Sequence, residues 1–269
     1  MLEVIDKGSL SESHPAPLLF VHGGQHAAWC WDEHFLDFFA AKGYRAVAVS
    51  LRGHGTSPNS KPPRACSITD YVEDVQTVAD NLPQTPVVIG HSLGGFVVQK
   101  YLESHAAPAA ALVASAPPQG AVAALLRNAG ALLRNMTQHP WRTVKAALTG
   151  QSLSGFNELE QVRAMFFSAH TPESLVVRFA ERLQNEPSGR WVLDMMFLNL
   201  PNPRRVSTPL LVLGAQCDRS VTTQELHATA RAYRTQAEIF PKMGHDMMLE
   251  PGWVAVAQRI HSWLCAQGL

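Results

Sequence analysis

Hydrophobic positions in this chain follow two patterns that alternate along its length. Short apolar runs typical of buried strands occur at 18–21, 44–50, 87–89, 109–114, 209–214 and 237–240. Longer stretches with helical periodicity occur at 31–42, 68–82, 96–104, 222–232 and 254–265. Ser67 or Thr69 is placed to cap the helix at 68–82. Strands that alternate with helices predict βαβ units, and therefore an α/β fold with a mostly parallel sheet and helices on both faces.

The stretch from residue 119 to 203 breaks this alternation, because it contains no convincing strand. Its apolar positions predict helices only, at about 122–135, 141–148, 159–168, 173–184 and 191–198. An all-helical insertion between two strands is most simply a cap over one end of the sheet. We therefore expect a core domain of residues 1–118 and 204–269 and a helical cap at 119–203. Many of the cap's hydrophobic side chains would form its own core, and the rest are suited to an apolar ligand pocket.

Composition narrows the class of protein. The chain has 269 residues, 46% of them hydrophobic, which is enough for one sizeable core. Its 22 basic and 22 acidic residues cancel, so no net field attracts nucleic acid or anionic lipid. We expect no signal peptide and no membrane span, and four widely spaced cysteines favour neither disulfides nor a zinc site. The expected location is the cytoplasm, and the oligomeric state stays open, a homodimer included.

A serine motif follows the apolar run at 87–89. Gly90-His91-Ser92-Leu93-Gly94 fits G-x-S-x-G and leads into a predicted helix. A nucleophile on a sharp strand-to-helix turn has a strained backbone and an exposed hydroxyl, and bulky neighbours two residues away would clash. The sequence therefore predicts Ser92 as a nucleophile. The similar stretch at 150–155 lacks the second glycine and follows a helical pattern, which favours a loop.

A serine nucleophile needs a general base and an acid that orients it. Among 12 histidines, His245 lies in a loop between a predicted strand and the last helix. Asp218 follows another predicted strand, whereas Asp194 lies in a cap helix and Asp246 adjoins His245 too closely to face its ring. The order Ser92, Asp218, His245, each beyond a strand, is typical of one class of catalytic triad.

The glycine-rich stretch "FVHGGQ" at 20–25 offers the remaining component, an oxyanion hole. Two backbone N–H groups aimed at a carbonyl oxygen stabilise its developing charge. Leu93, directly after the nucleophile, supplies one such group, and Gly24 is favoured over Gln25 for the other. A simple tight turn explains "HGG" equally well if the stretch is considered alone.

These motifs together resemble the α/β-hydrolase fold serine hydrolases. The similarity rests on "LLFVHGG", "GYRAVAVSLRGHGTS", "VVIGHSLGG", "LLVLGAQCD" and "MGHDMMLEPGW". The stretch "VHGGQHAAWCW" is similar to the start of plant-type esterases and hydroxynitrile lyases, and "LRGHGTS" to lysophospholipases and monoacylglycerol lipases. The resemblance implies a six- to eight-stranded sheet, a triad of Ser92, Asp218 and His245, and an oxyanion hole of Gly24 and Leu93.

The expected activity is hydrolysis of carboxylic esters of small to medium apolar substrates through an acyl-enzyme intermediate. Neither an organic cofactor nor a metal is implied. Because fold and triad do not fix a reaction, other activities stay open. They are carbon–carbon bond hydrolysis, thioester hydrolysis, cofactor-free perhydrolysis, a hydroxynitrile-lyase-like reaction, and non-catalytic binding of a small molecule as a receptor.

Overall fold

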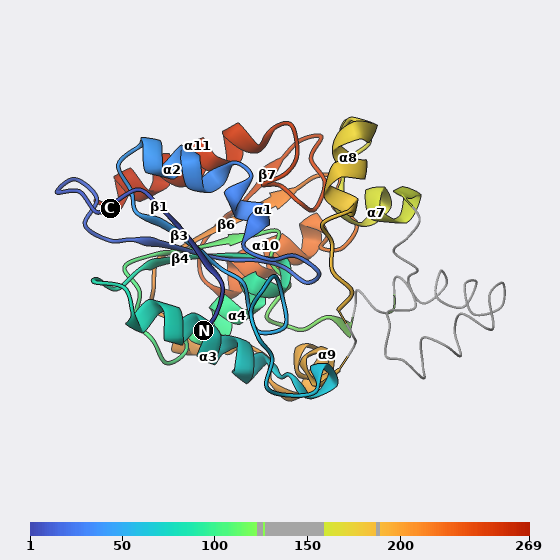
Figure 1. Ribbon diagram of the computed structural model, residues 1–269, viewed down its shortest axis with the longest axis horizontal. Coiled ribbons are helices and arrows are strands. Elements are labelled where there is room, and N and C mark those ends of the chain that lie inside the picture. Colours follow the sequence, from blue (N-terminus) through green and yellow to red (C-terminus); the bar gives the residue numbers. More distant parts are fainter. Residues whose placement is uncertain (123–125, 127–158, 187–188) are drawn as a thin grey trace.

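A seven-stranded sheet forms the centre of the molecule (Figure 1). The computed structural model describes residues 1–122, 126, 159–186 and 189–269. The strand order is β1-β3-β2-β4-β5-β6-β7, with β1 antiparallel to β3 and every other neighbouring pair parallel. The strands are β1 (Val4–Lys7), β2 (Leu18–Val21), β3 (Ala46–Val49), β4 (Val87–His91), β5 (Ala110–Val113), β6 (Leu210–Ala215) and β7 (Ala237–Phe240). This sheet confirms the predicted α/β class and falls within the expected six to eight strands.

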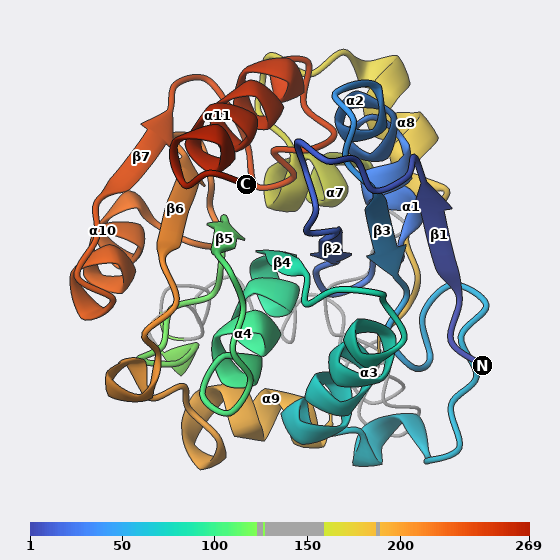
Figure 2. The same cartoon turned by 90° about the vertical axis from the view of Figure 1, so that its left-hand side faces the viewer.

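Side chains of the central strands alternate between two apolar layers, one on each face of the sheet. Leu18 and Phe20 of β2 pack into one layer, and Leu19 and Val21 into the other. Successive residues of a strand point to opposite faces, so a strand buried on both sides is continuously hydrophobic. The first layer is covered by α1 (Trp29–Asp32), α2 (Phe35–Ala41) and α11 (Trp253–Ala266), and the second by α3 (Ile68–Asp80), α4 (Ser92–Tyr101) and α10 (Thr223–Ala232) (Figure 2).

The helices follow the sequence-based expectations with two differences. Ser67 caps α3, where its hydroxyl accepts from the Asp70 N–H in a capping box. The single helix expected at 31–42 is wrong, because the chain forms α1 and α2 with a break at His34. The backbone of His34 leaves the helical region, and its ring stacks on Trp253 with the ring centroids 4.6 Å apart. The helix expected from residue 96 begins four residues earlier, at Ser92.

Between β5 and β6, the regular elements that the structure describes are all helical. These elements are α7 (Leu159–Phe166), α8 (Glu173–Ala180), α9 (Arg190–Leu193), a turn of π-helix η2 (Asp194–Leu198) and a short 3₁₀ turn η3 (Pro203–Arg205). Another 3₁₀ turn, η1 (Pro63–Ala65), lies outside this region and precedes α3. The inserted helices lie toward one end of the molecule (Figure 1). The helices expected at 122–135 and 141–148 and the loop at 150–155 fall outside the described residues, except for positions 122 and 126.

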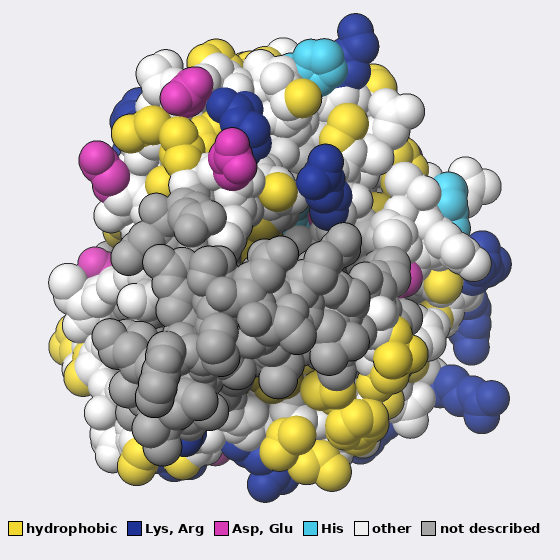
Figure 3. Space-filling view, turned by 90° about the vertical axis from the view of Figure 1, so that its right-hand side faces the viewer, with side chains coloured by type: hydrophobic (Ala, Val, Ile, Leu, Met, Phe, Trp, Pro, Cys, Tyr) yellow, Lys and Arg dark blue, Asp and Glu magenta, His cyan; other side chains and the backbone are white. Residues whose placement is uncertain are grey.

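Hydrophobic side chains are visible at several places on the end of the molecule that carries the insertion (Figure 3). Among the described residues of the insertion, the large exposed ones are Leu126, Val177, Leu193, Phe197 and Leu198. Others, such as Phe166 and Phe179, are buried in the layer that also contains α2 and α11. Within the part of the chain that is described, no helix is both long and apolar enough to cross a bilayer.

Candidate active site

Ser92 lies at the point where β4 ends and α4 begins. Its φ angle is +51°, in the left-handed region that a serine rarely adopts. The two flanking glycines allow this turn: a Cβ on Gly90 would lie 2.5 Å from the Gly94 oxygen, and one on Gly94 would lie 2.3 Å from the His22 oxygen. Ser92 is half-buried, and the N–H groups of the first turn of α4 follow it directly. This geometry is that of a nucleophile elbow.

The segment from Gly23 to Gln25 passes beside Ser92. A Cβ on Gly23 would lie 3.0 Å from Ser92 Cβ, and one on Gly24 would lie 3.9 Å from Leu93 Cδ2. The Gly23 carbonyl accepts a hydrogen bond from His22 Nδ1 at 2.7 Å. Because the C=O and N–H of a trans peptide point in opposite directions, this bond turns the Gly24 N–H away from His22. No hydrogen bond from that N–H is found among the described residues.

Asp218 and His245, which are 27 residues apart in sequence, are brought together beyond β6 and β7. His245 Nδ1 lies 2.7 Å from Asp218 Oδ2, and the two side chains are 3% and 0% exposed. The other Asp218 oxygen accepts from the N–H groups of Ser220 and Val221, at 2.7 and 3.0 Å. Since the carboxylate can only accept, His245 donates from Nδ1, and its neutral form has its free electron pair on Nε2.

The environment of His245 shifts its basicity in two directions. Burial lowers the pKa of the imidazole, but the charge of Asp218 and its hydrogen bond outweigh burial, so the pKa is raised above the ordinary 6.5. A base of this kind is stabilised as an imidazolium when it takes a proton, which a general base requires.

Ser92 and His245 are connected through His91 rather than by a direct bond. No hydrogen bond joins the Ser92 hydroxyl to the His245 ring in the described structure. In enzymes that lack a bound substrate, catalytic hydrogen bonds are often long and tighten only when substrate binds. His91 Nε2 donates to the His245 carbonyl at 3.0 Å, and the two rings lie 4.7 Å apart. Burial, with the neighbouring His245, lowers the His91 pKa to about 3, so that this ring is neutral. The structure therefore places the loop of His245 against the serine turn.

Glu186, in the inserted region, approaches the same glycines, and sequence reasoning missed it. Its Oε2 accepts from the Gln25 N–H at 3.0 Å and would lie 2.7 Å from a Cβ on Gly24. Its Oε1 accepts from the Tyr71 hydroxyl at 3.3 Å and lies 3.2 Å from His54 Nε2. Burial lowers the His54 pKa, but the charge and hydrogen bond of Glu186 outweigh burial, so the pKa is raised above its ordinary value. No local pattern signals this residue, because its partners lie more than 100 positions away.

The other candidates weighed from sequence have different surroundings. His22 Nε2 accepts from the Leu51 N–H at 3.0 Å, and burial lowers its pKa well below 6.5, so it is a neutral structural residue. Asp194 binds Arg190 and the Ile68 N–H, away from the Asp218–His245 pair. Asp246 turns away from the His245 ring and binds His26 Nε2 at 2.9 Å.

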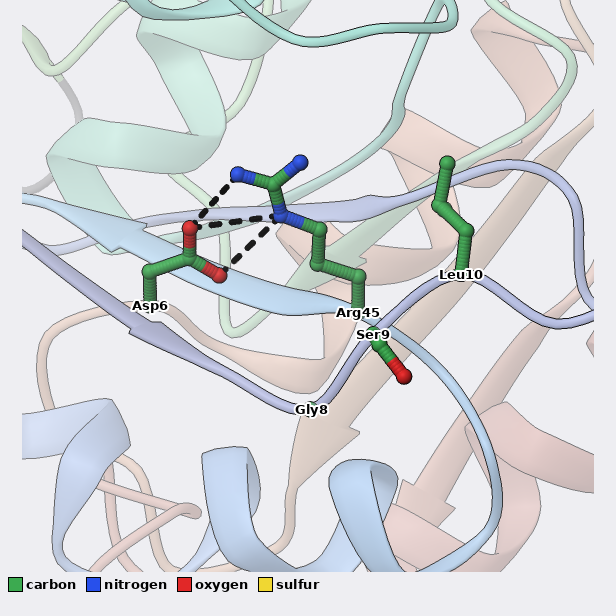
Figure 4. A pocket seen from close by; sticks show the side chains of 5 residues that line it. All are labelled: Asp6, Gly8, Ser9, Leu10 and Arg45. Atoms are coloured by element: carbon green, nitrogen blue, oxygen red, sulfur yellow. Dashed lines mark hydrogen bonds and ion pairs between the residues drawn. The ribbon is translucent and has the colours of Figure 1, made fainter.

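A surface pocket at the far end of the sheet is separate from this site. It is lined by Asp6, Gly8, Ser9, Leu10 and Arg45 (Figure 4). Because Lys7 pairs with Ala46, the first residue of β3, the pocket lies at the amino ends of the parallel strands. The Arg45 guanidinium is bound by Asp6, with Nη2 and Oδ2 2.7 Å apart. Within the described ranges, no group of three or more His, Cys, Asp or Glu side chains is arranged to hold a metal ion.

Comparison with known proteins identifies relatives of several activities. Over 106 residues the chain is 37% identical to a non-heme chloroperoxidase of Streptomyces lividans, covering 38% of this chain and 37% of that protein. Over 83 residues it is 34% identical to Methylesterase 10 of Arabidopsis thaliana, covering 29% of this chain and 28% of the relative. The matches thus span less than half of either relative.

Solved structures extend the similarity to the whole fold. A thermophilic esterase from Thermogutta terrifontis superposes with a TM-score of 0.76 at 20% identity, covering 100% of this chain and 94% of the esterase. At this identity the superposition establishes the shared fold. The sequence pattern of the alpha/beta hydrolase family matches residues 18–257, most of the chain. The chain therefore belongs to the alpha/beta hydrolase family.

Proposed function

We propose that the chain is a serine hydrolase that cleaves carboxylic esters of small to medium, uncharged substrates. The observation that carries this proposal is the 2.7 Å pair of Asp218 and His245 beside a serine with φ of +51°. A buried carboxylate that orients an imidazole next to a nucleophile elbow is the arrangement that activates a serine hydroxyl. The esterase and methylesterase relatives support the same reaction class.

In the proposed mechanism His245 Nε2 accepts the proton of the Ser92 hydroxyl as the oxygen attacks the ester carbonyl. The tetrahedral intermediate places its negative oxygen against the N–H groups of Leu93 and Gly24. Asp218 holds the imidazole in the required tautomer and stabilises its cation. His245 returns the proton to the leaving alcohol, which departs and leaves an acyl-serine. Water deprotonated by His245 then releases the acid and restores Ser92.

The surroundings of His245 support an apolar substrate. Phe166 of α7 lies with its ring 6.3 Å from the His245 ring and 5.2 Å from the ring of His26. Leu93 adds an apolar side chain beside Gly24. Glu186 contributes a carboxylate near the same glycine, which disfavours an anionic substrate by charge repulsion.

The direct test is labelling with a fluorophosphonate probe combined with turnover of p-nitrophenyl esters of increasing chain length. We expect the wild type and Ser104→Ala, an exposed serine, to be labelled and active. Ser92→Ala should lose labelling and about 10⁴–10⁶-fold of kcat. Labelling of Ser92→Ala equal to that of the wild type would refute the nucleophile assignment. Turnover near background by a folded wild type would favour a receptor, and faster turnover of thioester or carbon–carbon substrates would reassign the reaction.

The similarity to a chloroperoxidase favours one second candidate activity, perhydrolysis. Hydrogen peroxide would then replace water, attacking the acyl-serine to release a peracid and the free Ser92 hydroxyl. The peracid is measured by its oxidation of bromide in the presence of an ester and hydrogen peroxide. Oxidation that Ser92→Ala retains in full would exclude this route.

A further inference from the structure

A buried histidine and a buried aspartate outside the proposed triad form a pair directly behind it. The His26 and Asp246 side chains are both 0% exposed, and His26 Nε2 lies 2.9 Å from Asp246 Oδ2. Burial raises the pKa of the Asp246 carboxyl, but His26 and the neighbouring imidazoles outweigh this effect and lower it. A buried His–Asp pair contributes little net stability, because both groups must lose their water. Its placement therefore suggests a different role.

The pair connects the glycine segment to the loop of His245. The second ring nitrogen of His26, Nδ1, lies 2.9 Å from the Gly24 carbonyl. His22 holds the preceding carbonyl, that of Gly23, so the peptides on both sides of Gly24 are fixed by imidazoles. Glycine has the freest backbone of any residue, and without such anchors the direction of its N–H would not be set. At the other end, Asp246 directly follows His245 in the chain.

The serine turn contacts the same cluster. His91, the residue before Ser92, donates from Nε2 to the His245 carbonyl, and this nitrogen lies 3.7 Å from Asp246 Oδ1. Asp246 Oδ1 has no hydrogen-bond partner among the described residues. The oxyanion segment, the serine turn and the histidine loop thus meet at one buried carboxylate.

The pair is not a second acid–base centre. His26 Nε2 faces a carboxylate and Nδ1 faces a backbone carbonyl, so neither nitrogen is available to take a proton from a substrate. Aromatic rings shield it further: Trp29 and Phe166 lie 5.5 and 5.2 Å from the His26 ring. His26 can act only through the groups that it holds.

We propose that His26 and Asp246 are positioning residues that hold the Gly24 backbone and the His245 loop in register for catalysis, an inference that rests on the proposed esterase function. With Asp246→Leu, His26 keeps the Gly24 carbonyl as a partner for Nδ1 but has no acceptor for Nε2 in the His245 loop. The peptide that follows Gly24 then loses its anchor to the His245 loop, while the bond of His22 to the Gly23 carbonyl stays. Misplacement of one group by about 1 Å can reduce the rate of the chemical step about 100-fold.

The experiment measures kcat and KM per active site, counted by fluorophosphonate labelling, for the wild type, Asp246→Leu, His26→Gln and the double variant. We expect each single variant to lose about 10–100-fold in kcat with KM changed less than about threefold. The double variant should lose about as much as either single one, since both changes remove the same link. A purely structural role would instead reduce the fraction of labelled protein and leave kcat per labelled site unchanged.

Asp194→Leu is the matched control, because it also removes a buried carboxylate, 1% exposed, but one bound by Arg190 in the insertion. It should keep the wild-type kcat per labelled site. If a single variant does not fold, the double variant, which leaves no unpaired charge, gives the decisive comparison. A kcat per labelled site within threefold of the wild type in folded variants would overturn the positioning role alone. A folded wild type without turnover would overturn the proposed function as well.

Discussion

Replacing Glu250 by alanine should strongly destabilise the fold, because one buried carboxylate joins the insertion to the histidine loop. The side chain is 1% exposed. Oε1 accepts from the N–H groups of Gly244 and Ser168, at 2.9 and 2.5 Å, and Oε2 from the hydroxyls of Ser168 and Thr171, at 3.0 and 2.8 Å. These donors come from the loop that contains His245 and from the turn between α7 and α8.

The magnitude follows from what the substitution leaves behind. Each hydrogen bond to a charged acceptor contributes about 1.5–3 kcal/mol net, but bonds to one carboxylate are not additive. Each buried donor left without an acceptor costs about 1–3 kcal/mol, and because the four donors can relax together we expect a total loss of about 3–5 kcal/mol. At about 2–4 °C per kcal/mol for a chain near this size, Tm should fall by roughly 6–20 °C.

Far-UV circular dichroism during heating and during urea titration measures both quantities. Glu250→Gln, which keeps one acceptor oxygen, should lie between the wild type and Glu250→Ala. Glu12→Ala, at an exposed glutamate, should change the free energy of unfolding by less than about 0.5 kcal/mol. A loss below about 1 kcal/mol in Glu250→Ala would refute the reasoning, since it would mean that the four donors find other acceptors at little cost.

Three further predictions concern the site and its support. Asp218→Asn should lower kcat about 10⁴-fold. Burial, the largest influence, should then outweigh the remaining charge of Asp246 and lower the His245 pKa, so the acid limb of the residual pH–rate profile should move to lower pH. An unmoved limb would contradict the pairing of Asp218 with His245. Gly95→Ala should lower the free energy of unfolding, measured in urea, by about 1–3 kcal/mol, because the new Cβ would lie 2.3 Å from Ser115 Oγ. Adding Ser115→Gly to the same chain should restore part of this loss. Glu186→Leu should reduce kcat on a p-nitrophenyl ester about tenfold, because it frees the Gln25 N–H. Glu181→Leu, at an exposed glutamate, should leave kcat unchanged, and equal effects of the two variants would argue against a specific role of Glu186.

The sequence alone predicted features that depend on near neighbours in the chain. Alternation of short apolar runs with helical periodicity gave the α/β class, since each pattern depends on residues a few positions apart. The serine turn is equally local, because steric contacts among Gly90, Ser92 and Gly94 require small residues at that spacing. The break at His34 was missed, since the stacking partner of His34, Trp253, lies far along the chain.

Tertiary structure alone decided which side chains meet. The sequence favoured Asp218 over Asp246 as the partner of His245, but only the folded loops show that Asp246 turns to His26 instead. Hydrogen bonds such as that of Glu186 to Gln25 join residues separated by 161 positions, for which no periodicity exists. A sequence records the propensity of each segment, whereas the contacts between distant segments follow from how the sheet and its insertion pack.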